Sequence, residues 1–402
     1  MALYVIFFYT LVLLFLALLS FLALFSYKCS HSWTHPAFLT SMLWLIMVLC
    51  YNVLQHGLYP LSDLFYCALL LWCIPFCVCS LAFSKFNLPI PKILLWQMPN
   101  MKIFQKLSLL LVLLNVILLC FLNTISKDYG DNIMSGSRNM FIYHEDELPA
   151  LLNYLMYFLN VSVVFIISYM YTYGAKSISF KLLFVAVLIV LLCLGNKGGI
   201  ACSVFAVLFL QYYYGKLTFS RMIICLLLLV GVMTILVLVR GDAEDVTLTE
   251  YLLIYILSPM PAFDLILKGD LSFNVTPGAA TFSSIVKVLD VMGLGDNIKH
   301  LDASGWAYVP LPTNVYTNMF NYYVDFGYWG IFLFAILVGI AWGTLYNFMR
   351  RGVKLFVAIY ALFFHALLLA FFADWIFTFL SLSIQYLFIS HLLFIRFKIK
   401  YE

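Results

Sequence analysis

The sequence predicts an all-α polytopic integral membrane protein, and three observations support that fold class. Of the 402 residues, 65% are hydrophobic and 10% are charged, and the mean hydropathy is +1.04. Soluble domains contain about 25% charged residues, so most of this chain is suited to a lipid environment. Apolar runs close to the roughly 20 residues that a spanning helix needs recur along the chain, and the charged residues gather between them.

Eleven such runs predict about eleven transmembrane helices, with a range of ten to twelve. They lie near residues 3–26, 37–55, 61–83, 103–123, 148–173, 179–195, 198–214, 221–239, 328–349, 355–372 and 375–396. The first run lacks a preceding basic region and a small-residue cleavage site, so we expect an uncleaved span there. The runs divide the chain into an N-terminal bundle of about eight spans (1–239), a large loop (240–327) and about three C-terminal spans (328–402).

Basic residues predict the orientation, because Lys and Arg near the ends of spans mark the cytoplasmic side. Fifteen of the 22 Lys and Arg residues fall on one predicted face, and the C-terminus lies on that face. The outer seven are Lys127, Arg138, Lys197, Arg240, Lys268, Lys287 and Lys299. Seventeen of the 18 acidic residues also fall outside, so the outer face is expected to hold nearly all of the polar chemistry.

Two outer segments are long. Residues 126–149 are polar and mildly acidic, whereas residues 240–327 are too many for a structureless loop and are expected to have a structure and a function of their own. Within the second segment, Pro259 and Pro261 interrupt the apolar residues 251–267, which favours a re-entrant or interfacial element over an intact spanning helix. The residues that follow predict a loop, a short amphipathic helix and a glycine-rich turn.

Two outer cations are candidate anion ligands. Arg240 follows the run 221–239, where it either reaches to the membrane interface or grips a phosphate or carboxylate with its planar fork. Lys197 lies among Gly195, Gly198 and Gly199, which suit either a tight turn with a charged tip or a helix N-terminus that binds an anion. Together, two cations at the outer ends of helices favour a diphosphate ligand.

Two further titratable residues and the cysteines have alternative interpretations. His300 is either an ordinary surface residue or a general base that Asp296 or Asp302 orients. Asp374, near the outer end of a span, is expected to face either an aqueous cavity or the membrane interface. The ten cysteines lie in or beside apolar runs, and no His, Cys and acid grouping has metal-ligand spacing, so neither a disulfide framework nor a metal site is expected.

A family resemblance enters at residues 312–330, PTNVYTNMFNYYVDFGYWG. The sequence T-N-V-Y-T followed by N-Y-Y-x-D-F-G-Y-x-G resembles the oligosaccharide repeat-unit polymerases, the Wzy-type O-antigen and capsule polymerases of bacterial inner membranes. GNKGG at 195–199 is similar to the short basic turn of that family, RGD at 240–242 to its second basic site, and GAATFSS at 278–284 to part of its loop. The resemblance covers roughly 192–342. Lysine stands at position 197 where many relatives have arginine, and no periodic pair of R-x10-G motifs is present.

The resemblance implies a membrane glycosyltransferase of GT-C-like architecture, acting without a cofactor on the periplasmic face of the inner membrane. It would transfer a growing glycan from undecaprenyl diphosphate to the end sugar of another lipid-linked repeat unit, in lipopolysaccharide or capsule biosynthesis. The resemblance implies a chain-length regulator and a flippase of the same pathway as protein partners. It implies no nucleic-acid partner. Arg240 and Lys197 would stabilise the departing diphosphate, and His300, or else Asp325, would accept the proton of the acceptor hydroxyl.

The resemblance also implies a glycan-binding group, which consists of Asn314, Tyr316, Asn318, Tyr322 and Tyr323. Tyrosine rings offer faces for sugar rings, and asparagine side chains pair with sugar hydroxyls. An interfacial aromatic belt would account for the tyrosines but does not require the neighbouring Asn and Thr. A ligase that transfers the finished glycan and a flippase that transports it are the alternatives, and the near absence of charges within the spans argues against the flippase.

Overall fold

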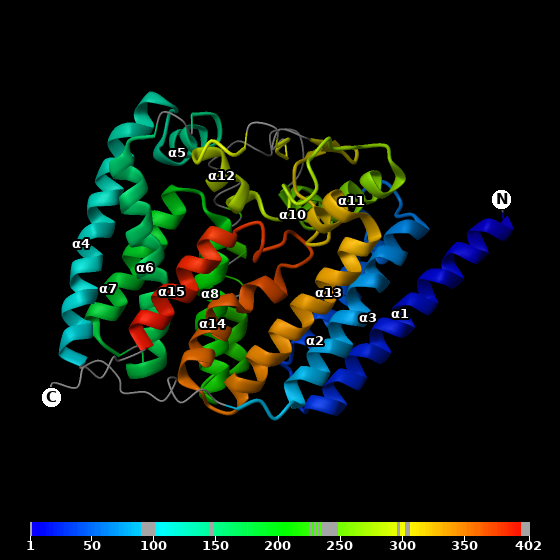
Figure 1. Ribbon diagram of the computed structural model, residues 1–402, viewed down its shortest axis with the longest axis horizontal. Helices are drawn as coiled ribbons and strands as arrows, with labels where there is room; N and C mark the ends of the chain where they lie inside the picture. The colour runs from blue at the N-terminus through cyan, green and yellow to red at the C-terminus, as the bar shows by residue number, and fades with distance from the viewer. Residues whose placement is uncertain are drawn as a thin grey trace. The chain divides into compact units, whose positions relative to one another are not determined.

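The computed structural model describes residues 2–89, 101–144, 148–174, 176–224, 227, 230–231, 234, 248–295, 298–301 and 306–394. Helices make up most of the structure (Figure 1). They are α1 (Ala2–Ser30), α2 (Pro36–Val53), α3 (Asp63–Lys85), α4 (Met101–Ile125), the 3-10 helix η2 (Ser126–Asp128), α5 (Ile133–Tyr143), α6 (Ala150–Tyr173), α7 (Ile178–Cys193), α8 (Lys197–Tyr213), α10 (Leu248–Leu257), α11 (Pro259–Lys268), α12 (Ser283–Val291), α13 (Phe320–Arg350), α14 (Lys354–Leu368) and α15 (Leu380–Phe394). The strands β1 (Ala307–Tyr308) and β2 (Pro312–Thr313) pair antiparallel.

An all-α membrane protein is the fold class that these helices support. Ten of the eleven predicted runs coincide with a helix, and the run 221–239 lies largely outside the described residues. Among the described residues, six helices are long and apolar enough to cross a membrane: α1, α2, α3, α4, α6 and α13. The bent pair α10 and α11 would make a seventh span, and α7, α8, α14 and α15 are shorter apolar helices. The total of eleven spans stays a prediction.

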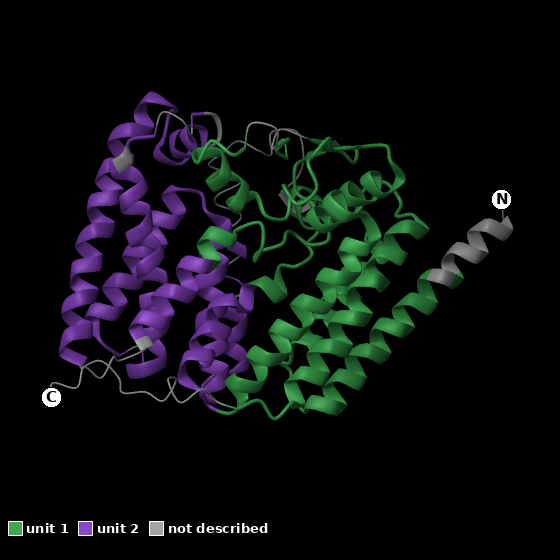
Figure 2. Ribbon diagram, in the orientation of Figure 1, with its two compact units in different colours: residues 1–89, 249–351, 366–383 green, residues 90–248, 352–365, 384–402 purple. Residues whose placement is uncertain are grey.

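Two compact units make up the chain (Figure 2). Unit 1 comprises residues 1–89, 249–351 and 366–383, and unit 2 comprises residues 90–248, 352–365 and 384–402. Residues 1–89 pack with residues 249–351 in unit 1. The division into an N-terminal bundle, a loop and C-terminal spans stays a prediction.

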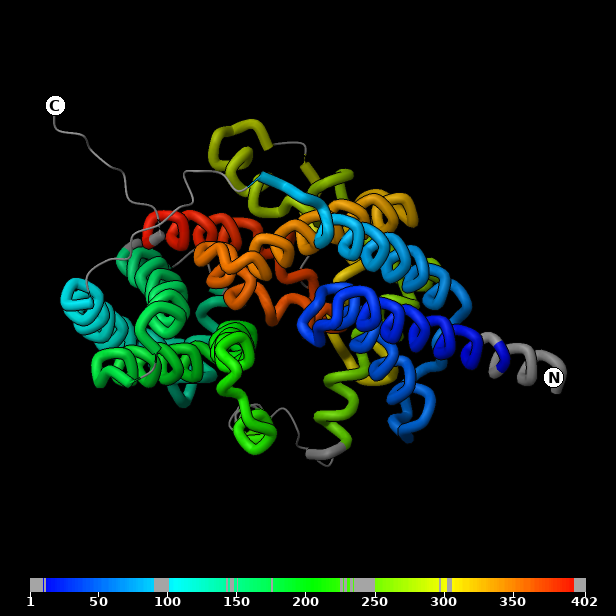
Figure 3. Tube along the Cα trace, turned by 90° about the horizontal axis from the view of Figure 1, so that it is seen from below, coloured from blue at the N-terminus to red at the C-terminus, as the bar shows by residue number. Residues whose placement is uncertain are grey.

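In unit 1, α1, α2, α3 and α13 lie side by side (Figures 1 and 3). The closest approach is between α3 and α13, at Gly339 and Gly343 of α13. A Cβ atom at Gly339 would lie 2.8 Å from the carbonyl oxygen of Phe76, and one at Gly343 would lie 2.5 Å from that of Ser80. Small residues four apart let two membrane helices meet at their backbones. We call this contact the α3–α13 seam.

Basic residues gather at one end of the unit 1 bundle. Lys28, Lys85 and Arg350 occupy the last turns of α1, α3 and α13, which all end on this side. Arg351 donates a hydrogen bond to the carbonyl oxygen of Leu88 at the same end. The buried His35, which caps α2, lies close enough that burial together with Arg350 and Lys85 lowers its pKa to about 3. The helix α12 and the strands β1 and β2 lie toward the opposite end of the bundle (Figure 1).

The helix α13 begins eight residues before the predicted span at 328, because its polar first turns are already helical. Gly327 interrupts it with φ +62° and ψ −151°, a backbone conformation that glycine adopts without steric cost. The two segments stay close across this break, since a Cβ at Gly330 would lie 2.1 Å from the carbonyl oxygen of Tyr322. Residues 320–326 therefore form a short separate helical segment at the end of the span.

The described part of residues 240–327 contains helices and two short strands. The helices α10 and α11 meet at a bend of 42° beside Pro259 and Pro261, which confirms that this apolar stretch is not one straight helix. The short helix α12 and the turn at Gly293, with φ +70°, follow as predicted. Residues 126–149 contain α5, a helix that the sequence analysis did not anticipate. Asn132 and Ser135 form a capping box at its N-terminus.

Candidate functional site

A pocket of about 320 Å³ lies in unit 1 beside the start of α13. Its lining comes from residues 273–321 of the outer segment and from residues 372–379, the connection between α14 and α15. These two parts of the chain are held together locally, because the N–H of Asn318 donates to the carbonyl oxygen of Ala370 at 3.0 Å. Two groups of stacked aromatic rings and a group of polar side chains line it. We call it the aromatic-walled pocket, the two ring groups its walls and the polar residues its floor.

The first wall is a cluster of three rings. Tyr316 and Phe320 stack with their centroids 4.3 Å apart and an interplanar angle of 18°. Phe273 meets both rings edge-on, at 6.0 Å from Tyr316 and 5.4 Å from Phe320. Each ring is thus fixed by the other two, which leaves a rigid apolar surface facing the pocket.

The second wall is the pair Trp375 and Phe379, stacked at 5.4 Å with an interplanar angle of 20°. The indole nitrogen of Trp375 donates to the carbonyl oxygen of Leu369 at 3.1 Å, which orients the ring. The two rings are four residues apart in the sequence and precede α15, which starts at Leu380, directly after Phe379.

Polar side chains form the floor. The amide nitrogen of Asn321 donates to the hydroxyl of Thr378 at 2.6 Å. Asn314 also lines the pocket, as does Thr317, whose buried hydroxyl has no hydrogen-bond partner among the described residues. A buried hydroxyl without a partner carries a desolvation cost that a ligand hydroxyl would remove.

Asp374 is the acidic residue of the floor, and it is 8% exposed. Its Oδ1 accepts the N–H of Ile376 at 3.0 Å, and its Oδ2 accepts those of Phe377 and Thr378 at 3.0 and 3.1 Å. The hydroxyl of Tyr322 also donates to this carboxylate. Burial raises the pKa of Asp374 from 3.8 to about 6, although these four hydrogen bonds favour the charged form.

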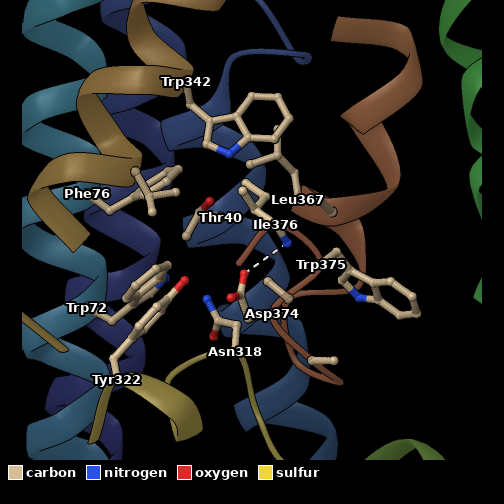
Figure 4. Close-up of a pocket in the computed structure, with 14 residues that line it drawn as sticks. Thr40, Trp72, Phe76, Asn318, Tyr322, Trp342, Leu367, Asp374, Trp375 and Ile376 are labelled. Carbon is tan, nitrogen blue, oxygen red and sulfur yellow. Dashed lines mark hydrogen bonds between the residues drawn. The ribbon is translucent and has the colours of Figure 1, made fainter. Parts of the chain in front are cut away.

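On its other side Asp374 lines a smaller cavity of about 20 Å³ within the helices of unit 1, which we call the inner cavity (Figure 4). Thr40 of α2, Trp72 of α3 and Asn318 line it together with Tyr322. The ring of Tyr322 stacks on Trp72 at 5.8 Å and 9°. The indole nitrogen of Trp72 and Oδ1 of Asn318 are buried without hydrogen-bond partners among the described residues. A space of this size holds about one water molecule.

Four of the five predicted glycan ligands line these two cavities. Asn314 and Tyr316 line the aromatic-walled pocket, and Asn318 and Tyr322 line the inner cavity. Tyr323 lines neither. Its ring packs edge-on against Phe263 of α11 at 5.9 Å and against Tyr328 at 5.2 Å.

The two predicted bases lie elsewhere in unit 1. His300 is exposed, with Nε2 3.1 Å from a carboxylate oxygen of Asp290, while the orienting residues Asp296 and Asp302 lie outside the described part of the chain. The carboxylate of Asp325 accepts the N–H groups of Ala280 and Thr281 at 3.1 and 2.6 Å. Asp325 thus ties the segment 278–284 to the start of α13, and neither predicted base lines either cavity.

The two predicted diphosphate ligands belong to a different part of the chain. Lys197 is the first residue of α8 in unit 2, where the side chain of Asn196 caps the helix by accepting the N–H of Gly199 at 2.8 Å. Gly195, with φ +61°, makes the tight turn that precedes it. Arg240 lies outside the described residues. In the described ranges, no group of three His, Cys, Asp or Glu residues is arranged to hold a metal ion.

In residues 371–379, FFADWIFTF, the sequence analysis singled out Asp374 as facing a cavity or the interface, but it missed the contribution of Trp375, Thr378 and Phe379 to the pocket. A signal was present, because Asp374 is the single acidic residue between 328 and 401 and aromatic residues surround it in the sequence. Trp375, Thr378 and Phe379 look like ordinary interfacial residues when they are considered alone. Only their position opposite Tyr316 and Phe320 makes them part of a site.

No protein-family model, curated protein sequence or solved structure matches this chain.

Proposed function

We propose that this protein is a glycosyltransferase that polymerises oligosaccharide repeat units carried on undecaprenyl diphosphate, on the periplasmic face of the bacterial inner membrane. The observation that supports this function best is the aromatic-walled pocket. A pyranose ring has flat apolar faces and a rim of hydroxyl groups, so two aromatic walls and a polar floor are complementary to it. Asn314 and Tyr316, which the resemblance assigns to glycan binding, both line this pocket.

The reaction joins two lipid-linked glycans. The bond between the anomeric carbon of the donor and its diphosphate breaks, and the electron pair leaves with the diphosphate. The anomeric carbon forms a new bond to a hydroxyl oxygen of the acceptor, which loses its proton. Lys197 and Arg240 remain the predicted cations for the departing charge, because preorganised cations favour a leaving group as its charge develops.

The dimensions of the site in unit 1 favour chemistry over transport. A flippase needs a polar path wide enough for a diphosphate sugar through the helices. The inner cavity, which Asp374 also lines, measures only about 20 Å³, and its lining includes Trp72, Tyr322 and Trp342. A ligase would use the same diphosphate leaving group and the same kind of pocket. Only the glycan product of the reaction therefore distinguishes a ligase from a polymerase.

Complementation tests the proposal and the pocket together. In a source strain that lacks its own copy, the wild-type protein should restore a ladder of surface polysaccharide lengths. Trp375→Ala removes one wall of the pocket, and we expect polymer yield to fall by about tenfold or more, since loss of a stacked ring weakens binding by about 1.4 kcal/mol or more. The gel is read after each variant is shown to reach the membrane. The matched control is Trp329→Ala, since Trp329 is 73% exposed and lines neither cavity.

Three outcomes would overturn parts of the proposal. A deletion strain that still makes full ladders excludes a polymerase. Long chains that accumulate on the lipid carrier in the deletion strain identify a ligase. If Lys197→Ala and Arg240→Ala both leave the ladder intact, those two cations do not serve the leaving group, while the pocket assignment still stands.

A further inference from the structure

We infer that Asp374 is the catalytic base of the proposed glycosyl transfer, and that its carboxylate takes the proton of the acceptor hydroxyl in the aromatic-walled pocket. This inference depends on the proposed function, because it assigns a residue to that reaction. It differs from the sequence-based assignment, which gave this role to His300 or Asp325.

The position of Asp374 is the first argument. A general base must lie within hydrogen-bond reach of the proton that it abstracts. Asp374 lines the pocket together with Trp375, Asn321 and Thr378. The hydroxyl groups of a sugar bound in this pocket would lie among these polar residues.

The second argument is the rigidity of the carboxylate. Three N–H groups of the following turn and the hydroxyl of Tyr322 hold it in one orientation. Oδ1 accepts the backbone hydrogen bond from Ile376, and Oδ2 accepts those from Phe377 and Thr378. A functional group whose rotamer is fixed by its neighbours is preorganised for reaction.

Other titratable groups in the described part of unit 1 have different duties. Asp264 is in a salt bridge with Lys268, at 2.7 Å. Asp325 holds the backbone of residues 280–281. His300 is exposed outside both cavities. Asp374 alone among these lines the pocket.

The electrostatic surroundings suit a base that works near neutral pH. Among the described residues no Lys, Arg or His forms an ion pair with Asp374, and the titratable group in contact with it is Tyr322 of α13. Asp374 also lines the inner cavity, and the residues that the neighbouring helices α2 and α3 contribute there include the uncharged Thr40 and Trp72. Burial raises the pKa of Asp374 to about 6, so at pH 7 the group is mostly ionised but more basic than an ordinary carboxylate.

The step balances without any further reactant. As the acceptor oxygen attacks the anomeric carbon, its proton passes to Asp374, and the electron pair of the broken carbon–oxygen bond leaves with the lipid diphosphate. The protonated carboxyl then releases its proton to water in the open pocket. General bases of this kind contribute about 10² to 10⁴ in rate.

Asp374→Asn is the first test, because the amide keeps the shape and one oxygen acceptor while it removes the basicity. Purified protein in lipid nanodiscs would be assayed for polymer formation and, separately, for retention of the lipid-linked repeat unit. We expect the transfer rate to fall by about 10²-fold or more while retention changes by less than about threefold. Asp270→Asn, at an exposed acid outside the pocket, should leave both unchanged.

The pH profile separates a base from a structural cap. Because the ionised carboxylate is the active form, the wild-type rate should fall as the pH drops through about 6. This acidic limb of the pH–rate profile should be absent from the residual activity of Asp374→Asn. An Asn variant that keeps more than a third of the wild-type rate, or that keeps the limb, overturns the assignment. If the wild-type protein forms no polymer at all, the proposed function fails instead.

Tyr322→Phe supplies a second test that does not alter Asp374 itself. The hydroxyl of Tyr322 lowers the pKa of Asp374, so its removal should raise that pKa further and move the acidic limb to higher pH. The rate at pH 6 should then fall more than the rate at pH 8, with the ring stacking on Trp72 retained. An equal loss at every pH, or an unmoved limb, contradicts a base at Asp374, and this readout serves even if Asp374→Asn fails to fold.

Discussion

Gly343→Leu is expected to prevent folded protein from accumulating in the membrane. A Cβ at this position would lie 2.5 Å from the carbonyl oxygen and 2.8 Å from the Cα of Ser80, and both are backbone atoms. The clash can be relieved only if α3 and α13 move apart along the seam. We expect a loss of about 3 kcal/mol or more, which is a large fraction of the stability of a typical domain. Fluorescence-detected size-exclusion in mild detergent would measure the yield of monodisperse protein.

Ala341→Leu is the matched control for this prediction. It lies between Gly339 and Gly343 on the same helix, but its side chain is exposed, where a membrane helix meets lipid. A leucine there adds the same bulk without meeting a protein backbone, so its yield should equal that of the wild type. If Gly343→Leu gives as much monodisperse protein as Ala341→Leu, the α3–α13 seam is not as close as the structure has it.

Lys268→Met is the second substitution with a large expected effect. Asp264 is 1% exposed, and its carboxylate accepts hydrogen bonds from the N–H and the hydroxyl of Ser62 while pairing with Lys268 at 2.7 Å. Removing the cation leaves a buried carboxylate without its ion-pair partner. Breaking one side of a buried pair costs about 3–5 kcal/mol, and we expect about 2–3 here because Lys268 is 32% exposed to solvent.

The double variant distinguishes this cause from a general loss of packing. Asp264→Asn combined with Lys268→Met replaces the charged pair by neutral groups, and the amide still accepts a hydrogen bond from Ser62. Its melting temperature in detergent should recover at least half of the loss seen with Lys268→Met alone. Additive losses in the two single variants would show that the pair does not act as a unit.

Much of the fold follows from local chemistry and was therefore predictable. Apolar length predicted helices at ten sites, and Pro259 and Pro261 predicted the break between α10 and α11. Helix partners were not predictable in the same way. Gly339 and Gly343 indicate that another helix packs closely against α13. The sequence around them does not identify that helix as α3, because the contacting residues are more than 250 positions away.

The residues of the candidate site likewise fall into a part that the sequence predicted and a part that it did not. The Asn, Thr and Tyr crowding at 313–323 predicted one side of the pocket, since these residues are close in the sequence as well as in space. Tyr322 and Tyr323 could not be told apart, because only the helical start at Phe320 sets which of the two faces the cavity. Asp374 was expected to face either a cavity or the membrane interface, but its proximity to Asn318 and Tyr322, some fifty residues earlier, is a property of the folded chain.

The break at Gly327 has a consequence for how such proteins diversify. It separates the α13 residues that line the aromatic-walled pocket, before the break, from the glycines of the seam, after it. Under the proposed function, substitutions at Tyr316, Phe320 or Trp375 would change which sugar is accepted without disturbing the glycines that keep the bundle assembled. A change of sugar specificity would then require substitutions only on one side of the break.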